Sequence, residues 1–351
     1  MSGRLARLQE LVTQIDADAL LVTNATNVRY LTGFASSNAA VLATADRVRL
    51  LTDGRYVEAA RGVEGVEVVR AERDLYGDLG RQLPALVGGP VAFEAEHVTV
   101  AQHARLSSEG VTLVQTRKVI EGLRAVKEDP ELEAVRRSTE LLNEAFEGLA
   151  GERVVGRTEA ELAWWMERAI RELGAEGVSF QPIVASGPNA ALPHHHPGDR
   201  VVGPDETLLV DAGARVDGYC SDCTRTFATG QLPSDLARAY EVCLDAQRRS
   251  LEGVVPGKGG VEVDAIARSL LREQGYEVMH GLGHAVGLEI HEDPRLSETS
   301  TDTLATGNVV TVEPGVYLAG VGGVRIEDLV IVGEAGPEVL TAFTKELVVL
   351  G

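Results

Sequence analysis

The sequence predicts an α+β protein built from two domains. A length of 351 residues is enough for two hydrophobic cores. Helix-like and strand-like periods alternate through the first third of the chain, which is typical of an α/β domain. In the last half, strand-like runs are joined mostly by short, glycine-rich connections. Such connections favour a mainly antiparallel sheet over a doubly wound one.

The first third is expected to begin with a helix followed by a strand. Apolar residues recur at helical spacing over residues 5–15, and residues 19–22 read as a short buried strand. The apolar run 40–51 is divided at residues 45–47, which predicts a hairpin. Helix-like and strand-like segments then alternate as far as a strand at residues 111–114.

A change of pattern near residue 125 predicts the domain boundary, with domains over residues 1–125 and 126–351. Asp129 followed by Pro130 is typical of a helix start, with Asp129 as N-cap and Pro130 at the first helical position. The helix that follows carries an apolar face, and a second helix is expected over residues 158–173. Helices therefore open the second domain.

The remainder of the second domain reads as strands interrupted by two helices. The expected strands are 182–186, 207–211, 219–228, 309–312 and 324–332, and the expected helices are 236–251 and 261–274. Residues 208–227 and 309–331 share one pattern, in which two apolar arms flank a glycine-bearing turn and each arm contains a carboxylate. Two hairpins of this kind would suit a pseudo-symmetric site for two metal ions.

Composition excludes several classes of protein. The hydrophobic fraction of 44% argues against wholesale disorder. A formal net charge of −20 repels phosphate backbones and anionic membrane surfaces, so neither nucleic acid nor membrane is an expected partner. Most of this acidity is interpreted as a solubility device. The absence of an apolar leader or membrane span, together with an odd cysteine count of 3, predicts a cytoplasmic protein.

Four carboxylates interrupt apolar strand-like runs: Asp211, Asp222, Glu313 and Glu327. Taken singly, Asp211 could end a strand and Asp222 could pair with Arg225. As a set they need more positive charge, because Arg225 and Arg325 can offset two carboxylates at most. Buried charges are rarely left uncompensated, so a divalent cation or a pair of cations is the more economical partner.

The eight histidines are concentrated at residues 194–196 and 280–291. Such clustering favours metal binding or acid–base chemistry over histidines in a solvated loop, although prolines on both sides of the first cluster favour a loop there. Glycines between His280 and His284 disfavour a helix, so these two histidines are expected on one strand face, with His291 further along. Carboxylates with one imidazole suit a pair of ions such as Mn, Co or Zn, which can activate water for hydrolysis.

These motifs resemble the pita-bread metallopeptidases, in the branch of Xaa-Pro dipeptidases (prolidases) and aminopeptidase P. The segments that carry the resemblance are Asp211-Ala212-Gly213, Asp222-x-Thr224-Arg225-Thr226-Phe227, His280-Gly281-Leu282-Gly283-His284, Glu313-Pro314-Gly315 and Arg325-Ile326-Glu327-Asp328. Residues 24–34 resemble the start of the creatinase/prolidase N-terminal domain. The resemblance therefore covers nearly the whole chain and implies a C-terminal pita-bread domain with a curved, mainly antiparallel sheet.

The resemblance also implies a set of site residues. The implied ligands of two divalent ions per subunit are Asp211, Asp222, His284, Glu313 and Glu327. Outer histidines would be His194, His280 and His291. Glu313 would also accept the proton of the nucleophile, while His291 or His194 would stabilise the oxyanion or protonate the leaving nitrogen. Arg295 and Arg325 are candidates for binding the substrate carboxylate, with a purely structural role as the alternative for each.

The expected activity is hydrolysis of the Xaa-Pro bond in proline-containing dipeptides or short peptides. An Xaa-Pro dipeptidase is favoured over an aminopeptidase P that acts on longer peptides. A creatinase-like hydrolase would share this architecture, and so would a pita-bread binding module that has lost catalysis. The complete ligand set argues against both, because the first is understood to need no metal and the second typically loses ligands. A homodimer is the expected assembly.

Overall fold

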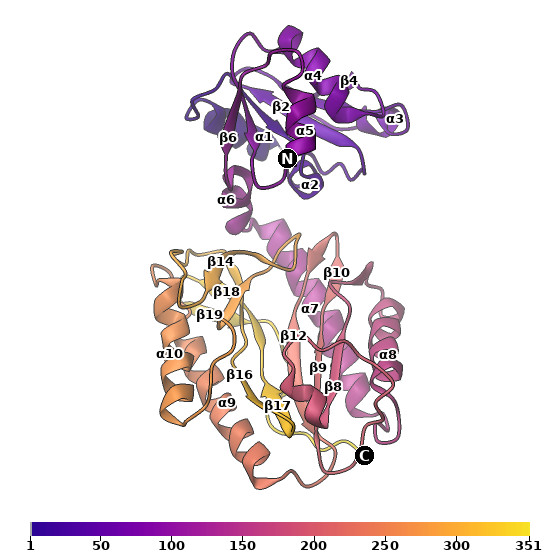
Figure 1. The fold of residues 1–351 in the computed structure, drawn as a ribbon, viewed down its shortest axis with the longest axis vertical. Helices are drawn as coiled ribbons and strands as arrows, with labels where there is room; N and C mark the ends of the chain where they lie inside the picture. The colour runs from indigo at the N-terminus through magenta and orange to yellow at the C-terminus, as the bar shows by residue number, and fades with distance from the viewer. Residues whose placement is uncertain (1) are drawn as a thin grey trace. The chain divides into compact units, whose positions relative to one another are not determined.

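The computed structural model describes residues 2–351, and the chain divides into two compact units, Met1–Arg124 and Ala125–Gly351. Each unit combines helices with strands (Figure 1). The sheet of the first unit mixes parallel and antiparallel pairs, whereas the paired strands in the sheets of the second unit run antiparallel. The predicted α+β class is confirmed.

The first unit is built on a six-stranded sheet with the order β4-β3-β2-β1-β5-β6. Its strands are β1 (Ala19–Val22), β2 (Ala39–Thr44), β3 (Val48–Thr52), β4 (Glu67–Arg70), β5 (Val91–Glu94) and β6 (Leu113–Thr116). Its helices are α1 (Ser2–Val12), α2 (Ala25–Thr32), α3 (Val57–Ala60), α4 (Leu75–Leu86), α5 (Val100–Leu106) and α6 (Val119–Ala125). The predicted strand at 19–22 and the predicted hairpin turn at 45–47 are both present.

Two of the helix boundaries that differ from the prediction have a clear physical reason. Helix α1 ends at Val12, because the amides of the next three residues bond to carbonyls three residues back rather than four. Helix α7 (Asp129–Ala150) has Glu128 as its N-cap, so the prediction of Asp129 was wrong. The reason is that the Glu131 carboxylate accepts a hydrogen bond from the backbone N–H of Glu128 at 2.9 Å, which fixes the helix start one residue earlier.

The second unit contains two main antiparallel sheets and several short strands. The larger sheets have the orders β12-β9-β8 and β14-β13-β15-β18-β19. The strands are β7 (Gly177–Val178), β8 (Ile183–Ser186), β9 (Thr207–Ala212), β10 (Ala214–Val216), β11 (Tyr219–Cys220), β12 (Cys223–Ala228), β13 (Gly283–Ala285), β14 (Glu292–Leu296), β15 (Val309–Val312), β16 (Gly315–Leu318), β17 (Gly322–Arg325), β18 (Asp328–Gly333) and β19 (Gly336–Val339).

Four long helices cover these sheets (Figure 1). Helices α7 and α8 (Glu159–Glu172) share a hydrophobic core with β9 and β12. Helices α9 (Ser234–Glu252) and α10 (Gly260–Glu273) share another with β15 and β18. A short 3₁₀ helix, η1 (Gly187–Ala191), follows β8. Among residues 2–351, none of the helices combines the length and the apolar character that a membrane crossing requires.

The repeated carboxylate pattern corresponds to a repeated arrangement of strands. Strand β9 pairs with β12 across the inserted strands β10 and β11, and β15 pairs with β18 across the inserted hairpin β16–β17. The runs predicted as continuous strands at 219–228 and 324–332 are each broken in the middle. The breaks fall at residues 221–222 and 326–327. At the second break, the backbone N–H of Glu327 donates to the carbonyl of Thr224 rather than to a residue of β15.

Candidate metal centre

One cavity of the second unit, with a volume of about 440 Å³, gathers the site residues singled out in the sequence. Those on its wall are His194, Asp211, Asp222, His280, His284, His291, Arg295, Glu313, Arg325 and Glu327. Four further wall residues that sequence reasoning did not single out are apolar: Phe180, Ile183, Pro193 and Ile290. The cavity therefore combines a charged floor with an apolar wall.

Asp211, Asp222 and Glu327 form the buried core of the site. Each contributes one carboxylate oxygen, and these three oxygens lie within 4.8 Å of one another. Asp211 lies on β9 in register with Thr224 of β12. Asp222 comes directly before β12 and Glu327 directly before β18, so the two strand breaks bring their side chains to one place.

These three carboxylates are not satisfied by the protein alone. Asp211 Oδ1, Asp222 Oδ1 and Glu327 Oε1 are buried and have no hydrogen-bond partner among the described residues. Burial raises the pKa of Asp222 and of Glu327 well above their ordinary values, and repulsion from the neighbouring carboxylates raises both further. Converging carboxylate oxygens without partners are the donor set that hard divalent cations prefer, so the residues fit a metal centre.

His284 and Glu313 extend this donor set. His284 Nε2 lies 3.7 Å from Asp222 Oδ2 and 3.4 Å from Glu313 Oε1. Its Nδ1 lies 3.1 Å from the carbonyl of Ala285, an arrangement that leaves Nε2 available to a metal ion. Burial lowers the pKa of His284 to about 3, which keeps the ring neutral as a metal ligand must be.

Thr311 ties these two ligands together. Its hydroxyl donates to Glu313 Oε1 at 3.2 Å and accepts from the backbone N–H of His284 at 3.0 Å. Burial raises the pKa of Glu313 to about 7, with Arg325 acting in the opposite direction. In the protein without metal, this carboxyl group can therefore take up and release a proton near neutrality.

Arg325 is the buried cation of the site. Its Nη2 donates to Asp211 Oδ2 at 2.6 Å, its Nη1 donates to the Tyr317 hydroxyl at 3.1 Å, and its Nε donates to Thr224 Oγ1 at 3.0 Å. The Thr224 hydroxyl in turn donates to Glu327 Oε2 at 2.7 Å. Arg325 therefore orients two of the three core carboxylates. Sequence reasoning missed Tyr317 and Thr224 as contributors, although Thr224 lies inside one of the recognised motifs.

The sequence offered Arg225 as the ion-pair partner of Asp222, and that interpretation was wrong. Arg225 Nη2 lies 3.0 Å from Asp328 Oδ1 instead. The reason is the alternation of side chains along β12, which turns Thr224 towards Glu327 and Arg225 to the opposite face. Asp222 is thereby left beside other carboxylates without an arginine of its own.

The segment around His280 is less regular than the expected strand. Strand β13 contains only Gly283–Ala285, because the backbone N–H of Leu282 bonds to Asp264 Oδ1 at 2.9 Å rather than to a neighbouring strand. Gly283 is required by a close approach, since a Cβ there would lie 2.1 Å from the carbonyl oxygen of Thr311. His280 precedes the strand and still lines the cavity, with its Nε2 2.8 Å from the Tyr317 hydroxyl.

His194, His291 and Arg295 lie where the cavity opens to solvent. His194 follows η1 and is exposed, as is His291, whose ring centroid is 4.5 Å from that of His284 in an edge-on arrangement. Burial, followed by the charge of Arg295, lowers the pKa of His291. The Arg295 side chain is 44% exposed and its Nε lies 3.8 Å from Asp293 Oδ1, so its guanidinium can reach an anionic ligand.

Comparisons with known proteins find similar family models, sequences and solved structures. Residues 133–334 match metallopeptidase family M24, and residues 4–126 match the creatinase/prolidase N-terminal domain. The chain is 31% identical to the Xaa-Pro dipeptidase of Pyrococcus furiosus, over 99% of this chain and 100% of that protein. Its fold matches the Xaa-Pro dipeptidase from Bacillus anthracis with a TM-score of 0.95 and 35% identity, over 99% of both chains. It matches the X-Pro aminopeptidase from Thermotoga maritima with a TM-score of 0.88 and 33% identity, over 98% of this chain and 100% of that one.

Proposed function

The chain belongs to metallopeptidase family M24, and from this premise we propose that it hydrolyses the Xaa-Pro bond of proline-containing dipeptides. The observation that carries the proposal is the cluster of buried carboxylate oxygens without partners on the floor of the cavity. The Pyrococcus furiosus and Bacillus anthracis relatives, both named Xaa-Pro dipeptidases, support the choice of substrate.

We propose two divalent ions as the cofactor, drawn from manganese, cobalt and zinc. Their ligands would be Asp211, Asp222, His284, Glu313 and Glu327. When bound, such a pair of ions supplies a hydroxide nucleophile near neutral pH and polarises the scissile carbonyl. The chain's own residues then position the substrate and move protons around it.

Proton transfer is assigned to three side chains. Glu313 would accept the proton of the nucleophile, since it lies on the cavity wall and Thr311 fixes its carboxylate. His291 and His194 lie at the cavity mouth, where a histidine can donate a hydrogen bond to the oxyanion or a proton to the leaving proline nitrogen. His280 acts through Tyr317, to which its Nε2 is bonded, rather than on the substrate directly.

Substrate binding is assigned to the opening and the apolar wall. Arg295 is the stronger candidate for the proline carboxylate, because Arg325 is already bonded to Asp211, Tyr317 and Thr224. The proline ring would lie against the apolar wall formed by Phe180, Ile183 and Ile290. A charged anchor and an apolar wall in one cavity suit a dipeptide with a free carboxylate.

Aminopeptidase P activity on longer peptides is the second candidate, supported by the similarity to the X-Pro aminopeptidase from Thermotoga maritima. We also propose residues 1–125 as the N-terminal domain and residues 126–351 as the catalytic domain. A homodimer, a cytoplasmic location and the lack of nucleic-acid partners complete the proposal. These further points rest on the sequence.

The decisive experiment compares the dipeptide Ala-Pro with the tripeptide Ala-Pro-Ala, using protein stripped of metal and reloaded with Mn²⁺, Co²⁺ or Zn²⁺. We expect faster hydrolysis of Ala-Pro by at least one metal form and no turnover in the stripped protein. A clear preference for Ala-Pro-Ala would establish the second candidate instead. Undiminished turnover without metal would contradict both.

The ligand assignment is checked in the same experiment with Asp222→Ala. Loss of this carboxylate removes one of the three converging oxygens, so elemental analysis should find fewer than two ions per chain. A variant that keeps two ions would show that Asp222 is not a ligand.

A further inference from the structure

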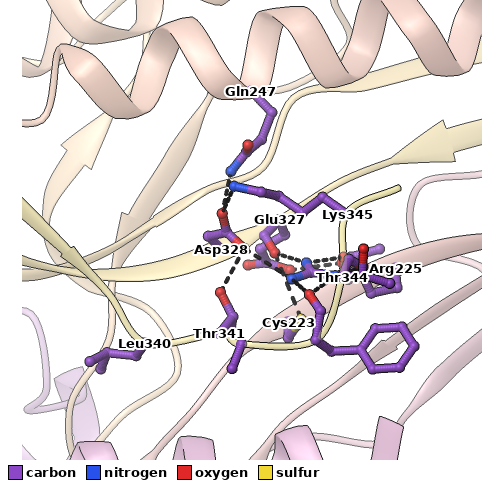
Figure 2. Close-up of polar contacts among 12 residues, drawn as sticks. Cys223, Arg225, Gln247, Glu327, Asp328, Leu340, Thr341, Thr344 and Lys345 are labelled. Atoms are coloured by element: carbon purple, nitrogen blue, oxygen red, sulfur yellow. Dashed lines mark hydrogen bonds and ion pairs between the residues drawn. The ribbon is translucent and has the colours of Figure 1, made fainter. Parts of the chain in front are cut away.

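Asp328 directly follows the proposed ligand Glu327 and is fully buried. Four donors converge on its carboxylate (Figure 2). Arg225 Nη2 and Thr341 Oγ1 donate to Oδ1 at 3.0 and 2.6 Å, and Gln247 Nε2 and Lys345 Nζ donate to Oδ2 at 2.7 and 2.5 Å. None of these residues lines the cavity, and their hydrogen bonds to Asp328 involve no side chain of a proposed ligand.

The same cluster fixes the backbone of Glu327. Arg225 Nη1 donates to the Glu327 carbonyl, and the thiol of Cys223 lies 3.7 Å from the same oxygen. On the other side, the Glu327 N–H donates to the carbonyl of Thr224 at 3.1 Å. Both backbone polar groups of Glu327 are therefore held by β12, and its side-chain carboxylate lies beside those of Asp211 and Asp222.

The far side of the cluster is formed by residues 341–345, which we name the C-terminal clamp. Arg225 donates to the Phe343 carbonyl at 2.7 Å and to the Thr344 carbonyl at 3.1 Å. Thr341 and Lys345, at the two ends of the clamp, supply two of the four donors to Asp328. Arg225 thus lies between the clamp and Glu327 and contacts both (Figure 2).

Three charges are gathered in this cluster, with exposed side-chain fractions of 2% for Arg225, 0% for Asp328 and 21% for Lys345. Burial alone would raise the pKa of Asp328, but Arg225 and Lys345 outweigh it and hold the pKa below its ordinary value. Buried ion pairs add little stability compared with well-packed apolar side chains. Stability alone therefore does not account for three charges here, whereas a fixed orientation of Glu327 does.

We propose that Asp328, Arg225 and Lys345 are positioning residues for the metal centre, and that the C-terminal clamp sets metal affinity by holding Glu327 against β12. The inference rests on the proposed function in one respect, the binding of metal ions by the carboxylates. Partners outside the ligand shell typically contribute roughly ten- to hundredfold to metal affinity. Loss of one clamp contact should therefore weaken metal binding while the ligands themselves remain in place.

The test uses the full chain stripped of metal. Calorimetric titration with Mn²⁺ and Co²⁺ is compared for wild type, Asp328→Asn and Lys345→Met, and thermal unfolding of each is measured without metal. Lys258→Met is the matched control, because Lys258 pairs with Glu262 at the surface. We expect roughly ten- to hundredfold weaker metal binding in Asp328→Asn and Lys345→Met and unchanged binding in the control. Lys345→Arg, which keeps the charge and a donor, should restore most of the affinity.

Wild-type affinity in Lys345→Met and Asp328→Asn would overturn the inference, even if both variants unfold at lower temperature. If Asp328→Asn does not fold, the Lys345→Met variant decides the test. The Lys345 side chain is partly exposed, and its replacement leaves the Arg225–Asp328 ion pair in place. Because no peptide is present, the result is independent of the substrate. A wild type that binds metal but leaves Ala-Pro intact would contradict the proposed function alone, and a wild type that binds no metal would contradict both.

Discussion

Glu313 differs from the other carboxylates of the cavity because its side chain is 17% exposed and its pKa of about 7 lies close to neutrality. In an unfolded chain the same group would have a pKa near 4.5. The folded protein without metal therefore holds an extra proton on Glu313 between these two values. This proton makes the stability of the metal-free protein depend on pH.

The sign of this dependence follows from the raised pKa. Stability contributed by protonated Glu313 is present below about pH 4.5 and is lost as the pH rises through about 7. Histidines with lowered pKa values act in the opposite direction, so the comparison needs a variant. We expect metal-free Glu313→Gln to gain stability relative to metal-free wild type over this range, by up to about 3 kcal/mol. Urea unfolding at several pH values measures the difference.

A pH-independent difference between Glu313→Gln and wild type would show that Glu313 is already ionised in the folded protein. His280 and His284 are present in both proteins, so the comparison reduces their contribution to the measured difference. Addition of metal should reduce the pH dependence of wild type, because a bound cation favours the ionised carboxylate.

Single residues also show where the sequence was informative. The four carboxylates and His284 were recognisable because charges inside apolar strands are rare and because they lie in motifs. Tyr317 was not recognisable, since a tyrosine in an apolar strand reads as core. The Tyr317 hydroxyl contacts both Arg325 and His280. These contacts form only when the chain folds, so the sequence alone does not reveal them.

Among the secondary-structure elements, strand interiors could be predicted and strand breaks could not. Apolar runs located β9, β12, β15 and β18, because these strands are buried along nearly their whole length. The interruptions before β12 and β18 could not be recognised in these runs, since Asp222 and Glu327 lie inside segments that read as continuous strands. They arise from hydrogen bonds between distant segments, such as Glu327 N to Thr224 O.

Helix α8 has a consequence for the loop that carries His194. Its first residue, Glu159, is fully buried and accepts hydrogen bonds from Ser186 N at 2.8 Å and Asn189 Nδ2 at 3.0 Å. His195 Nε2 lies 2.7 Å from Glu159 Oε2. The contact of His195 with Glu159 therefore holds the neighbouring His194 close to helix α8.

We expect Glu159→Gln to lower kcat/KM for Ala-Pro by roughly tenfold, because a neutral amide accepts these bonds more weakly and His194 loses its fixed place. Metal content should not change, since no predicted ligand contacts Glu159. Steady-state kinetics with elemental analysis checks both statements. Glu167→Gln, on the same helix with a surface ion pair to Arg171, is the matched control. Equal kcat/KM values for the two variants would show that Glu159 does not position His194.

At the scale of the whole molecule, the proposed ligands belong to one of the two compact units. Metal binding should therefore stabilise that unit selectively. At a metal concentration of 100 times Kd, binding adds about 2.7 kcal/mol, which corresponds to a rise in Tm of roughly 5–11 °C for a unit of this size. Removal of metal by a chelator should lower Tm by the same amount.

Differential scanning calorimetry with and without chelator measures this effect. We expect a metal-sensitive transition from the unit Ala125–Gly351 and a metal-insensitive one from the unit Met1–Arg124. A single, metal-sensitive transition would show that the two units unfold as one cooperative block. Unchanged transitions would mean that the ions do not bind the folded chain.

The dispersal of the ligands along the chain also determines when the site can exist. A ribosome releases Asp211 long before Glu327, and the clamp at residues 341–345 comes later still. A nascent chain that exposes only the first carboxylates has neither the second strand pair nor the contacts that orient Glu327. If these residues are the ligands, the site would be incomplete during synthesis, and metal selection would fall to the folded protein.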